Sequence, residues 1–408
     1  MKSKSLTGFT VLLLIIVGFG AGYFVGQSPW APYAFFGPAT GTPDEAKEAF
    51  APFWEVWNLV HARYYQQPVD DTLLTKGAID GMLAVLDDPH TRYLSPVDEE
   101  AAREAMSGEF QGIGAEVEAV DENIVVVSPI EGSPAEAAGL KPGDILRQAD
   151  GVDLTGLDVS EAASLVRGPA GTAVHLLIER DGEQFEVEIV RDTIALKSVR
   201  SEMLDNNIAY VRLSRFGDQS AKEMAEALDS VMAANPAGLI LDLRHNPGGS
   251  LDTAVSIADQ FLPAGIILRE RFGSGSEQLY ESTDKGLAQD VPLVVLIDEG
   301  SASASEVLAG AIQDVGRGIL IGQTSYGKGT VQTWQGLSNG GGVRLTIARW
   351  LTPNETWVNG TGLTPDYFIP LPDTASGEEP IDTQRQAALD FLSGQQIISV
   401  PPVAEPEG

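Results

Sequence analysis

Residues Gly300–Glu306 read GSASASE, and residues Tyr326–Gln332 read YGKGTVQ. The first stretch places small serines at the start of an apolar helix pattern, and the second holds a lysine between two glycines. A serine hydroxyl is a poor nucleophile until a base removes its proton, and a lysine that burial keeps neutral can be that base. Together, the two stretches raise the hypothesis of a hydrolase with a serine nucleophile and a lysine base.

Each stretch also has a purely structural interpretation when it is taken alone. Ser303 is followed three residues later by Glu306, which is the pattern of a capping box at a helix start. Spacing does not decide between Ser301, Ser303 and Ser305, and a lysine such as Lys328 is ordinarily a solvated surface charge. The choice of nucleophile therefore stays open on these two stretches alone.

Residues 322–328 (GQTSYGK) also match the front of a nucleotide-binding P-loop. Gly329 follows, where a P-loop has Ser or Thr to bind magnesium. In addition, Thr330–Trp334 alternates like a strand, whereas a P-loop leads into a helix. We therefore reject nucleotide binding.

From Ile194 onward, strand patterns alternate with helix patterns, which predicts an α/β domain with a largely parallel sheet. The expected elements are strand 208–213, helix 220–233, strand 239–243, helix 251–261, strand 293–297, helix 303–315 and strand 319–321. Functional residues in such folds gather where strands end and helices begin. Arg244–Gly249 (RHNPGG) and Asp298–Ser303 lie at two such junctions, and glycines in the first allow backbone N–H groups to face a ligand.

The composition excludes several classes of function. The 408 residues are enough for two or three domains. The formal net charge of −32 argues against nucleic acid as a partner, because phosphate binding needs clustered Lys and Arg. The absence of cysteine excludes thiol catalysis, disulfides and thiolate metal sites. The four histidines have no metal-ligand spacing, so a metalloenzyme is not expected.

The first segment is a targeting element. Lys2 and Lys4 precede an uncharged apolar run, Phe9–Val25, that is long enough to cross a bilayer. We expect a signal anchor over residues 1–27, with its basic end inside the cytoplasm and the catalytic part outside it, periplasmic or extracellular. The alternative is a signal peptide cleaved at an atypical site, since no A-x-A pattern follows the run.

Short helices are expected after a linker at 28–41. Thr42–Glu45 (TPDE) reads as a capped helix start, and apolar residues then recur at helical spacing. A second helix is expected over about Asp71–Leu86. Its inward residues would be Leu74, Ile79, Met82, Leu83 and Leu86. These helices are too short to bury a large core alone, so we expect them to pack on a neighbour or to pair between subunits.

Residues 109–192 form a separate unit of short strands and two helices. The strands are expected at 114–120, 124–127, 145–149, 173–179 and 185–190, and the helices at Ser133 onward and at 159–166. Asp181-Gly182 is a hairpin signal, and Gly139 can end the first helix in the left-handed conformation. This order, with Gln111–Gly114 (QGIG) entering the first strand and SPAEAAGLKPGDIL in the middle, resembles a PDZ domain.

Several ordered motifs extend this resemblance to most of the chain. They are LDLRHNPGG at 241–249, SASASE at 301–306, QDxGR at 313–317, YGKGTVQ at 326–332, DDPHT at 87–91 and GTGLTPD at 360–366. With the PDZ-like unit, they closely resemble the carboxyl-terminal processing peptidases, also called tail-specific proteases, over about residues 45–370. The resemblance implies a serine endopeptidase with a crotonase-like α/β core and an inserted PDZ domain.

The resemblance also implies roles for single residues. Ser303 is the nucleophile, Lys328 the general base and Gln332 the residue that orients it. The N–H groups of Gly249 and Ala304 form the oxyanion hole. No cofactor or metal is required, because peptide hydrolysis needs none.

In the PDZ domain, the resemblance implies that loop N–H groups hold the free carboxylate of a substrate tail. The loop residues are Gln111, Gly112, Ile113 and Gly114. Arg167, at the end of the second PDZ helix, is a regulatory candidate that would reach Gln332, although an arginine there is ordinarily solvated. The expected partners are therefore polypeptides with free C-termini.

The predicted organisation has six parts. They are a signal anchor at 1–27, a linker at 28–41, a helical region at 42–108, a PDZ domain at 109–192, an α/β serine peptidase core at 193–370 and a C-terminal tail with a short helix at 371–408. Two alternatives stay open. One is a catalytically silent peptide-binding or tethering protein of the same architecture, and the other is an acyl transferase or small-ester hydrolase. The PDZ-like unit favours a polypeptide substrate over the second alternative.

Overall fold

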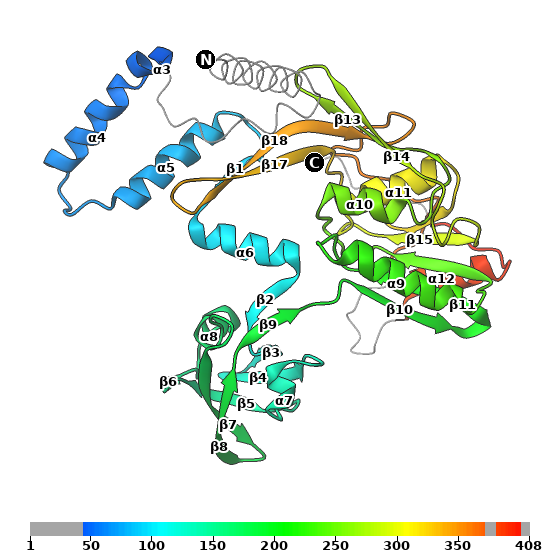
Figure 1. Cartoon of the computed structure of the whole chain (residues 1–408), viewed down its shortest axis with the longest axis horizontal. Helices are drawn as coiled ribbons and strands as arrows, with labels where there is room; N and C mark the ends of the chain where they lie inside the picture. The colour runs from blue at the N-terminus through cyan, green and yellow to red at the C-terminus, as the bar shows by residue number, and fades with distance from the viewer. Residues whose placement is uncertain (1–43, 372–380, 401–408) are drawn as a thin grey trace, which may run out of the picture. The chain divides into compact units, whose positions relative to one another are not determined.

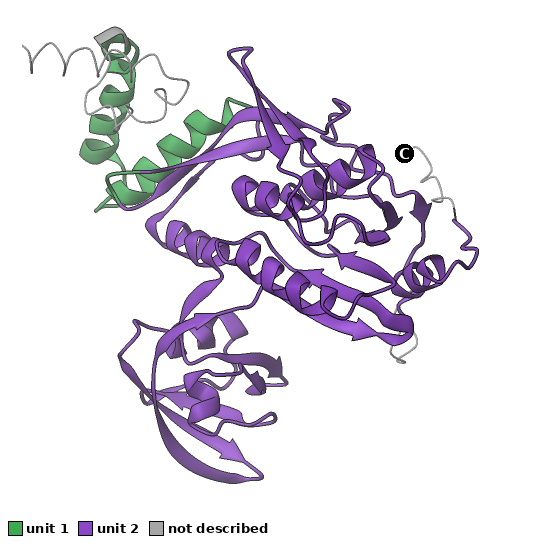
Figure 2. Ribbon diagram, turned by 45° about the vertical axis from the view of Figure 1, so that its right-hand side comes forward, with its two compact units in different colours: residues 1–86, 337–339 green, residues 87–336, 340–408 purple. Residues whose placement is uncertain are grey.

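The computed structural model describes residues 44–371 and 381–400, and Figure 2 shows their division into two units. Of these described residues, the first unit holds 44–86 and 337–339, and the second holds the rest. No helix within the described ranges is long and apolar enough to cross a membrane. The predicted anchor at 1–27 and the linker after it lie outside the described residues, as does the Thr42 cap.

The first unit contains three helices: α3 (Asp44–Ala49), α4 (Ala51–Arg63) and α5 (Asp71–Ala84). Asp70 caps α5, because its side chain accepts the N–H groups of Thr72 and Leu73. The inward stripe predicted for this region is confirmed in part, since Leu83 is buried and Leu74 and Ile79 are half-buried. The prediction is wrong for Met82 and Leu86, which are exposed.

The PDZ-like part of the second unit follows the predicted order of elements. Its elements are β3 (Ala115–Val120), β4 (Asn123–Pro129), α7 (Pro134–Ala137), β5 (Ile145–Ala149), β6 (Val152–Asp153), α8 (Val159–Val166), β7 (Ala173–Arg180) and β8 (Glu183–Val190). Asp181 and Gly182 both have positive φ, as the tight turn between β7 and β8 requires. A separate hydrophobic core, which includes Ile124, Leu176 and Ile178, fills this part.

The α/β core contains a six-stranded sheet in the order β10-β11-β12-β15-β16-β19 (Figure 1). All its neighbouring pairs are parallel except β10 with β11, which confirms the predicted largely parallel sheet. The strands are β10 (Val199–Leu204), β11 (Ile208–Leu213), β12 (Gly238–Asp242), β15 (Leu293–Ile297), β16 (Ile319–Gly322) and β19 (Tyr367–Phe368), with a 3₁₀ turn (Asp205–Asn207) between β10 and β11.

Helices cover both faces of this sheet. The helices are α9 (Ser220–Met232), α10 (Leu251–Ala258), α11 (Ala304–Asp314) and α12 (Thr383–Leu392). Leu239 and Leu241 of β12 belong to the core that includes α9, α10 and α11, whereas Ile240 belongs to the core that includes α12. Successive residues of a strand face opposite sides of the sheet. Since both sides of this sheet are buried, its strands are apolar without interruption in the sequence. The short helix expected in the C-terminal tail is α12, and it packs against the sheet.

A second sheet was not predicted. It contains β1 (Arg92–Leu94), β13 (Gly265–Phe272), β14 (Glu277–Ser282), β17 (Thr330–Gly336) and β18 (Gly342–Leu351). Of its strands, β17 alone has a counterpart in the sequence pattern, the alternation at Thr330–Trp334. Three further elements complete the unit: α6 (Pro96–Ser107) and the paired strands β2 (Glu109–Gly112) and β9 (Asp192–Ala195).

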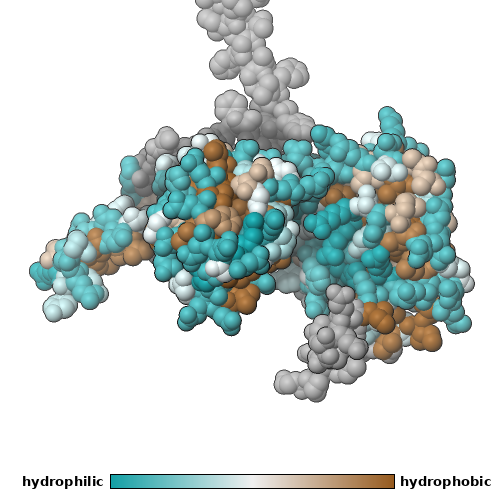
Figure 3. All heavy atoms as spheres, turned by 90° about the horizontal axis from the view of Figure 1, so that it is seen from below, coloured by the Kyte–Doolittle hydropathy of each residue, from teal (hydrophilic) through white to brown (hydrophobic). Residues whose placement is uncertain are grey.

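The described surface is mostly hydrophilic on the face shown in Figure 3, with smaller hydrophobic areas between the polar ones. This matches a chain with 58 acidic and 26 basic residues. One pocket differs from this acidic composition, because all of its charged lining residues are basic.

Candidate active site

One pocket of the second unit is lined by residues from both the GSASASE and the YGKGTVQ stretches. Ser303 and Ala304 enter it from the start of α11, Lys328 from the loop before β17, and Gln332 from β17 itself. Gly249, from the loop that follows β12, also lines it. All five residues predicted for catalysis and for the oxyanion hole therefore line a single pocket, although they come from three separate segments of the chain.

The structure separates the three serines of the SASAS stretch by their surroundings. Ser301 and Ser305 are fully buried. The Ser301 hydroxyl donates to the Leu243 carbonyl at 2.9 Å, and the Ser305 hydroxyl donates to the Asn246 carbonyl at 2.8 Å. Ser303 is partly exposed and lines the pocket. Buried hydroxyls that are bonded to the backbone cannot meet a substrate, so only Ser303 has access to one.

Ser303 has an unusual backbone conformation, with φ of 55° and ψ of −113°. A non-glycine residue with positive φ is strained, and such strain is concentrated at functional sites. The residue immediately precedes α11, so the positive end of the helix dipole acts on its oxygen. Ala304, as the first residue of α11, has an N–H group without an acceptor inside the helix.

The loop after β12 packs so closely against Ser303 on one side and Phe216 on the other that two glycines are required. A β-carbon on Gly248 would lie 2.7 Å from the Ala302 carbonyl oxygen and 2.9 Å from the Ser303 β-carbon. A β-carbon on Gly249 would lie 2.2 Å from the Phe216 carbonyl oxygen. Both glycines have positive φ. Glycine is the residue that tolerates such an approach, which brings backbone beside the serine.

A buried carboxylate, Glu306, connects the serine to the lysine loop. Its oxygens accept the N–H of Ser303 at 2.8 Å, of Gly327 at 2.6 Å and of Lys328 at 2.9 Å, and the hydroxyl of Ser325 at 2.6 Å. The bond to the Ser303 N–H is the helix cap that the sequence pattern predicts for Glu306. The other three bonds join residues about twenty positions apart, which no local pattern indicates.

Burial gives Lys328 the property that a lysine base needs. Desolvation, assisted by the Arg344 guanidinium, lowers the pKa of Lys328 to about 8. Glu306 acts in the opposite direction, and Arg92 lowers the pKa further. A solvated lysine has a pKa of about 10.4 and is almost wholly protonated at neutral pH. The site therefore keeps a usable fraction of neutral amine. Neither arginine is indicated by the sequence motifs.

Gln332 is held by threonine hydroxyls. Its side-chain N–H₂ donates to Thr330 at 2.8 Å and to Thr346 at 3.2 Å. Thr346 in turn donates its hydroxyl hydrogen to Asp88, so its oxygen is left to accept from the amide. Since the Thr346 oxygen must accept, the Gln332 group that faces it is the N–H₂ group. The side-chain oxygen of Gln332 therefore remains free to accept a hydrogen bond. Asp88, in the DDPHT motif, is a supporting residue that the sequence did not assign.

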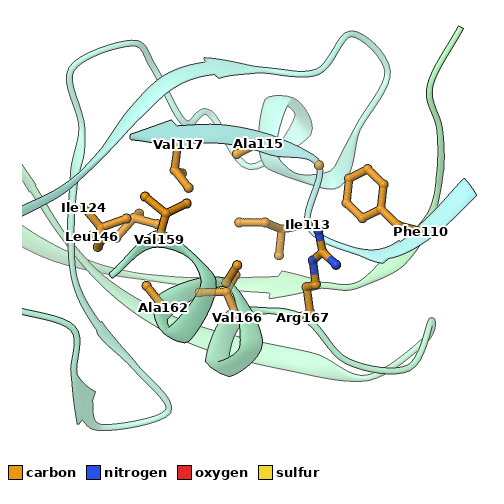
Figure 4. A pocket seen from close by; sticks show the side chains of 12 residues that line it. Phe110, Ile113, Ala115, Val117, Ile124, Leu146, Val159, Ala162, Val166 and Arg167 are labelled. Carbon is orange, nitrogen blue, oxygen red and sulfur yellow. The ribbon is translucent and has the colours of Figure 1, made fainter. Parts of the chain in front are cut away.

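A second pocket lies in the PDZ-like part, between β3 and α8 (Figure 4). It is mostly apolar, and Ile113 and Gly114 line it as predicted from the QGIG segment. Gln111 and Gly112 are not among its lining residues. The Gln111 side chain instead accepts the Ala170 N–H at 2.8 Å.

Arg167 is the one charged residue that lines this second pocket. Its guanidinium lies 5.2 Å from the centre of the Phe110 ring and 3.7 Å from Glu104. Figure 4 shows it beside Ile113 and Phe110 at one end of the groove. Arg167 does not line the pocket of Gln332, so the predicted contact between the two residues stays a prediction.

Three stretches of the chain match family models. Residues 207–369 match the peptidase family S41, residues 125–180 match a PDZ domain, and residues 36–100 match the N-terminal domain of the activating protease CtpB. The order of the three matches along the chain is that of the predicted helical region, PDZ domain and α/β core.

Relatives match over most of the chain. The carboxy-terminal processing protease CtpA of Bacillus subtilis is 37% identical over 378 residues, covering 92% of this chain and 79% of that protein. A carboxyl-terminal-processing protease of Synechocystis is 38% identical over 353 residues, covering 84% and 82%. A solved putative S41 protease from Bacteroides fragilis matches in fold, with a TM-score of 0.53 at 19% identity over 81% of this chain and 91% of that one.

Proposed function

The chain belongs to the carboxy-terminal processing proteases, serine-type peptidases of family S41 with a PDZ domain, and on that premise we propose that Ser303 and Lys328 perform its peptide hydrolysis. The proposal rests on one observation: Ser303 and Lys328 line the same pocket, and burial there lowers the pKa of Lys328 to about 8. A serine is activated in this way by an adjacent base that is neutral at the working pH.

The chemical steps follow from these two groups. Neutral Lys328 takes the hydroxyl proton as the Ser303 oxygen attacks the peptide carbonyl, and the protonated lysine then gives that proton to the leaving amine. Lys328 next deprotonates a water molecule, which attacks the acyl-enzyme; the bond to the Ser303 oxygen breaks, the acid product leaves, and Lys328 returns the proton to the Ser303 oxygen. Gln332 orients the lysine, because its amide oxygen is left as an acceptor for the ammonium.

The oxyanion hole in this proposal consists of the N–H groups of Gly249 and Ala304. Both residues line the pocket beside Ser303, and the start of α11 adds a favourable dipole. Negative charge that develops on the carbonyl oxygen would be stabilised by donors already in place, which costs no rearrangement during the reaction.

We further propose that the PDZ-like groove binds the C-terminal tail of the substrate. The apolar lining, which includes Val117, Val159 and Val166, suits an apolar terminal side chain, and the Ile113–Gly114 loop would hold the carboxylate. The tail would add as a strand beside β3, as peptides do in domains of this type.

One experiment tests the assignment. The full chain in mild detergent is incubated with an unstructured polypeptide such as casein, and the products are mapped by mass spectrometry. Wild-type protein should produce internal cleavages, and Ser303→Ala should produce none. Binding of tail peptides without cleavage by the wild type would favour the silent tethering protein instead.

Two proposals concern the N-terminal part. We propose that residues 1–27 anchor the chain, with its catalytic part outside the cytoplasm, because Lys2 and Lys4 flank one end of the apolar run. An anchored chain should resist extraction from membranes by alkaline carbonate and be digested by protease added from outside. Release into the soluble fraction without residues 1–27 would support a cleaved signal peptide.

The helices of the first unit would mediate homo-oligomer formation. No residue of α4 is buried, and Phe50, Trp54 and Leu59 are exposed at or beside it. Such an apolar surface is typical of an interaction site. Light scattering after size-exclusion chromatography should give a multiple of the 43.3 kDa chain mass, and Trp54→Glu should reduce it. A monomer at all concentrations would contradict this proposal.

A further inference from the structure

Two arginines share the catalytic pocket with Ser303 and Lys328. Arg92 of β1 and Arg344 of β18 both line it, and they are direct cross-strand partners in the register of those strands. Side chains of directly opposed residues lie on the same face, about 5 Å apart at the β-carbon, and like charges placed so are destabilising. With Lys328, they put three basic side chains around one cavity.

No acidic residue lines this pocket. Within residues 44–371 and 381–400, neither Arg92 nor Arg344 has a carboxylate within ion-pair distance. Arg92 is exposed and Arg344 is half-buried. Two other arginines of the core show the contrast: Arg244 bonds two aspartates, and Arg317 donates to three backbone carbonyls. Arg92 and Arg344 thus face each other without a carboxylate partner, in a chain with more than twice as many acidic as basic residues.

The surroundings hold Arg344 ready for a ligand. Its guanidinium lies 5.9 Å from the centre of the Trp334 ring, and Trp334 is fixed by donating its indole N–H to Glu99 at 2.5 Å. Burial and the nearby Arg92 both lower the pKa of Arg344 from its ordinary value, so the pair is under repulsion that an anion would relieve. A guanidinium fork binds a carboxylate through two parallel hydrogen bonds.

We propose that Arg92 and Arg344 form a carboxylate-binding subsite in the catalytic pocket, which selects substrates with a carboxylate close to the scissile bond. The carboxylate has two sources, an acidic side chain or the free C-terminus of a short leaving segment. This subsite rests on the proposed function of Ser303 and Lys328. It is separate from the PDZ-like groove, which has its own lining residues.

The test uses the full chain and matched fluorogenic peptides. In one series, a single Glu is moved position by position across the scissile bond, and each peptide has a Gln counterpart. At one position, wild-type kcat/KM should be about tenfold or more higher for Glu than for Gln, as for a charge-assisted hydrogen bond. In Arg344→Gln and in Arg92→Gln, this ratio should fall to near one. Because each ratio is taken within one variant, a general loss of activity cancels.

Arg349→Gln is the matched control. Arg349 is on the same strand, β18, and lies 5.5 Å from the centre of the Trp357 ring, but it does not line the catalytic pocket. It should keep the wild-type ratio. Arg344→Lys should keep part of the preference, which separates a charge effect from misfolding of the glutamine variant.

A second series separates the two sources of carboxylate. Peptides with free and amidated C-termini are compared in wild type and in Arg344→Gln. An amidation effect that disappears in Arg344→Gln belongs to this subsite, and one that persists belongs to the PDZ-like groove. A Glu/Gln ratio near one at every position, with an amidation effect equal in both proteins, would overturn the subsite. Failure of the proposed function would look different, because wild type would then cleave no peptide.

Discussion

The PDZ-like groove and the catalytic pocket differ in how they are assembled and in what lines them. The groove is apolar, with Arg167 as its one charged lining residue, and the helix and sheet that form it are neighbours in the chain. The pocket of Ser303 and Lys328 has both polar and apolar lining residues, and its charged lining consists of Lys328, Arg92 and Arg344. In both pockets, every charged lining residue is basic, within a chain of net charge −32. The groove suits binding of an apolar tail, whereas the pocket has the groups for chemistry.

The largest effect is expected from Ser303→Ala, which tests whether peptide hydrolysis takes place in the pocket of Ser303 and Lys328. Ser303→Ala should lower kcat by about ten-thousandfold or more, since loss of a nucleophile removes the covalent route. The measurement is the rate of casein degradation, with circular dichroism to confirm folding. Ser301→Ala is the control and should keep appreciable activity, because its hydroxyl is buried against Leu243. Loss of activity in Ser301→Ala with an active Ser303→Ala would reverse the assignment.

Replacement of the base should be nearly as damaging. Lys328→Arg should lower kcat by about a thousandfold, because a guanidinium keeps its proton while a general base must be neutral. In wild type, the pKa of Lys328 is about 8, so activity should rise with pH through that value and fall in acid as the amine protonates. Substantial turnover by Lys328→Arg would show that the residue acts as a cation and not as a base.

Glu306→Gln tests whether the pocket depends on long-range connections. An amide offers one acceptor oxygen where the carboxylate offers two, and its N–H₂ would face N–H donors of Gly327 or Lys328. We expect kcat to fall by about a hundredfold and thermal stability to decrease, as for a buried polar group left unpaired. Glu299→Gln, at an exposed carboxylate of a nearby loop, is the control and should behave like wild type.

Changes to the groove should affect substrate binding more than turnover. Amidation of a peptide's C-terminus should lower kcat/KM by about tenfold, mainly through KM, because a charged hydrogen-bond acceptor is lost. Arg167→Ala should cause a smaller, few-fold loss. Lys141→Ala, at an exposed residue outside the groove, should cause none. Equal cleavage of amidated and free-acid peptides by wild type would remove tail recognition from the groove.

The smallest effect concerns the electrostatics of the pocket. Arg344→Gln removes a cation that lowers the pKa of Lys328, so the pH–activity curve should move toward higher pH. Burial is the larger cause and remains, so the shift should be about one pH unit or less. Arg349→Gln should leave the curve in place. A curve for Arg344→Gln that coincides with the wild-type curve would show that burial alone sets this pKa.

Sequence alone predicted the helices and strands whose side chains face the same kind of environment along their whole length. The strand Ile145–Ala149 and the helix Val159–Val166 have the predicted bounds, as do Ile208–Leu213 and Leu293–Ile297. These segments alternate regularly or are continuously apolar, because each faces one core or two. The strands β13 and β18 were missed. Arginines and glutamates such as Arg269, Glu270 and Arg344 interrupt their apolar pattern, and the surroundings that accommodate those charges come from distant segments.

The sequence by itself provided the hypothesis of a serine nucleophile and a lysine base, and the ordered motifs around the two opening stretches indicated the family. Which serine is accessible was decided by tertiary structure, because the buried carbonyls of Leu243 and Asn246 occupy the other two hydroxyls. Tertiary structure also decided the lowered pKa of Lys328. Desolvation and the field of Arg344 depend on distances between segments far apart in the chain, and no local pattern of residues contains those distances.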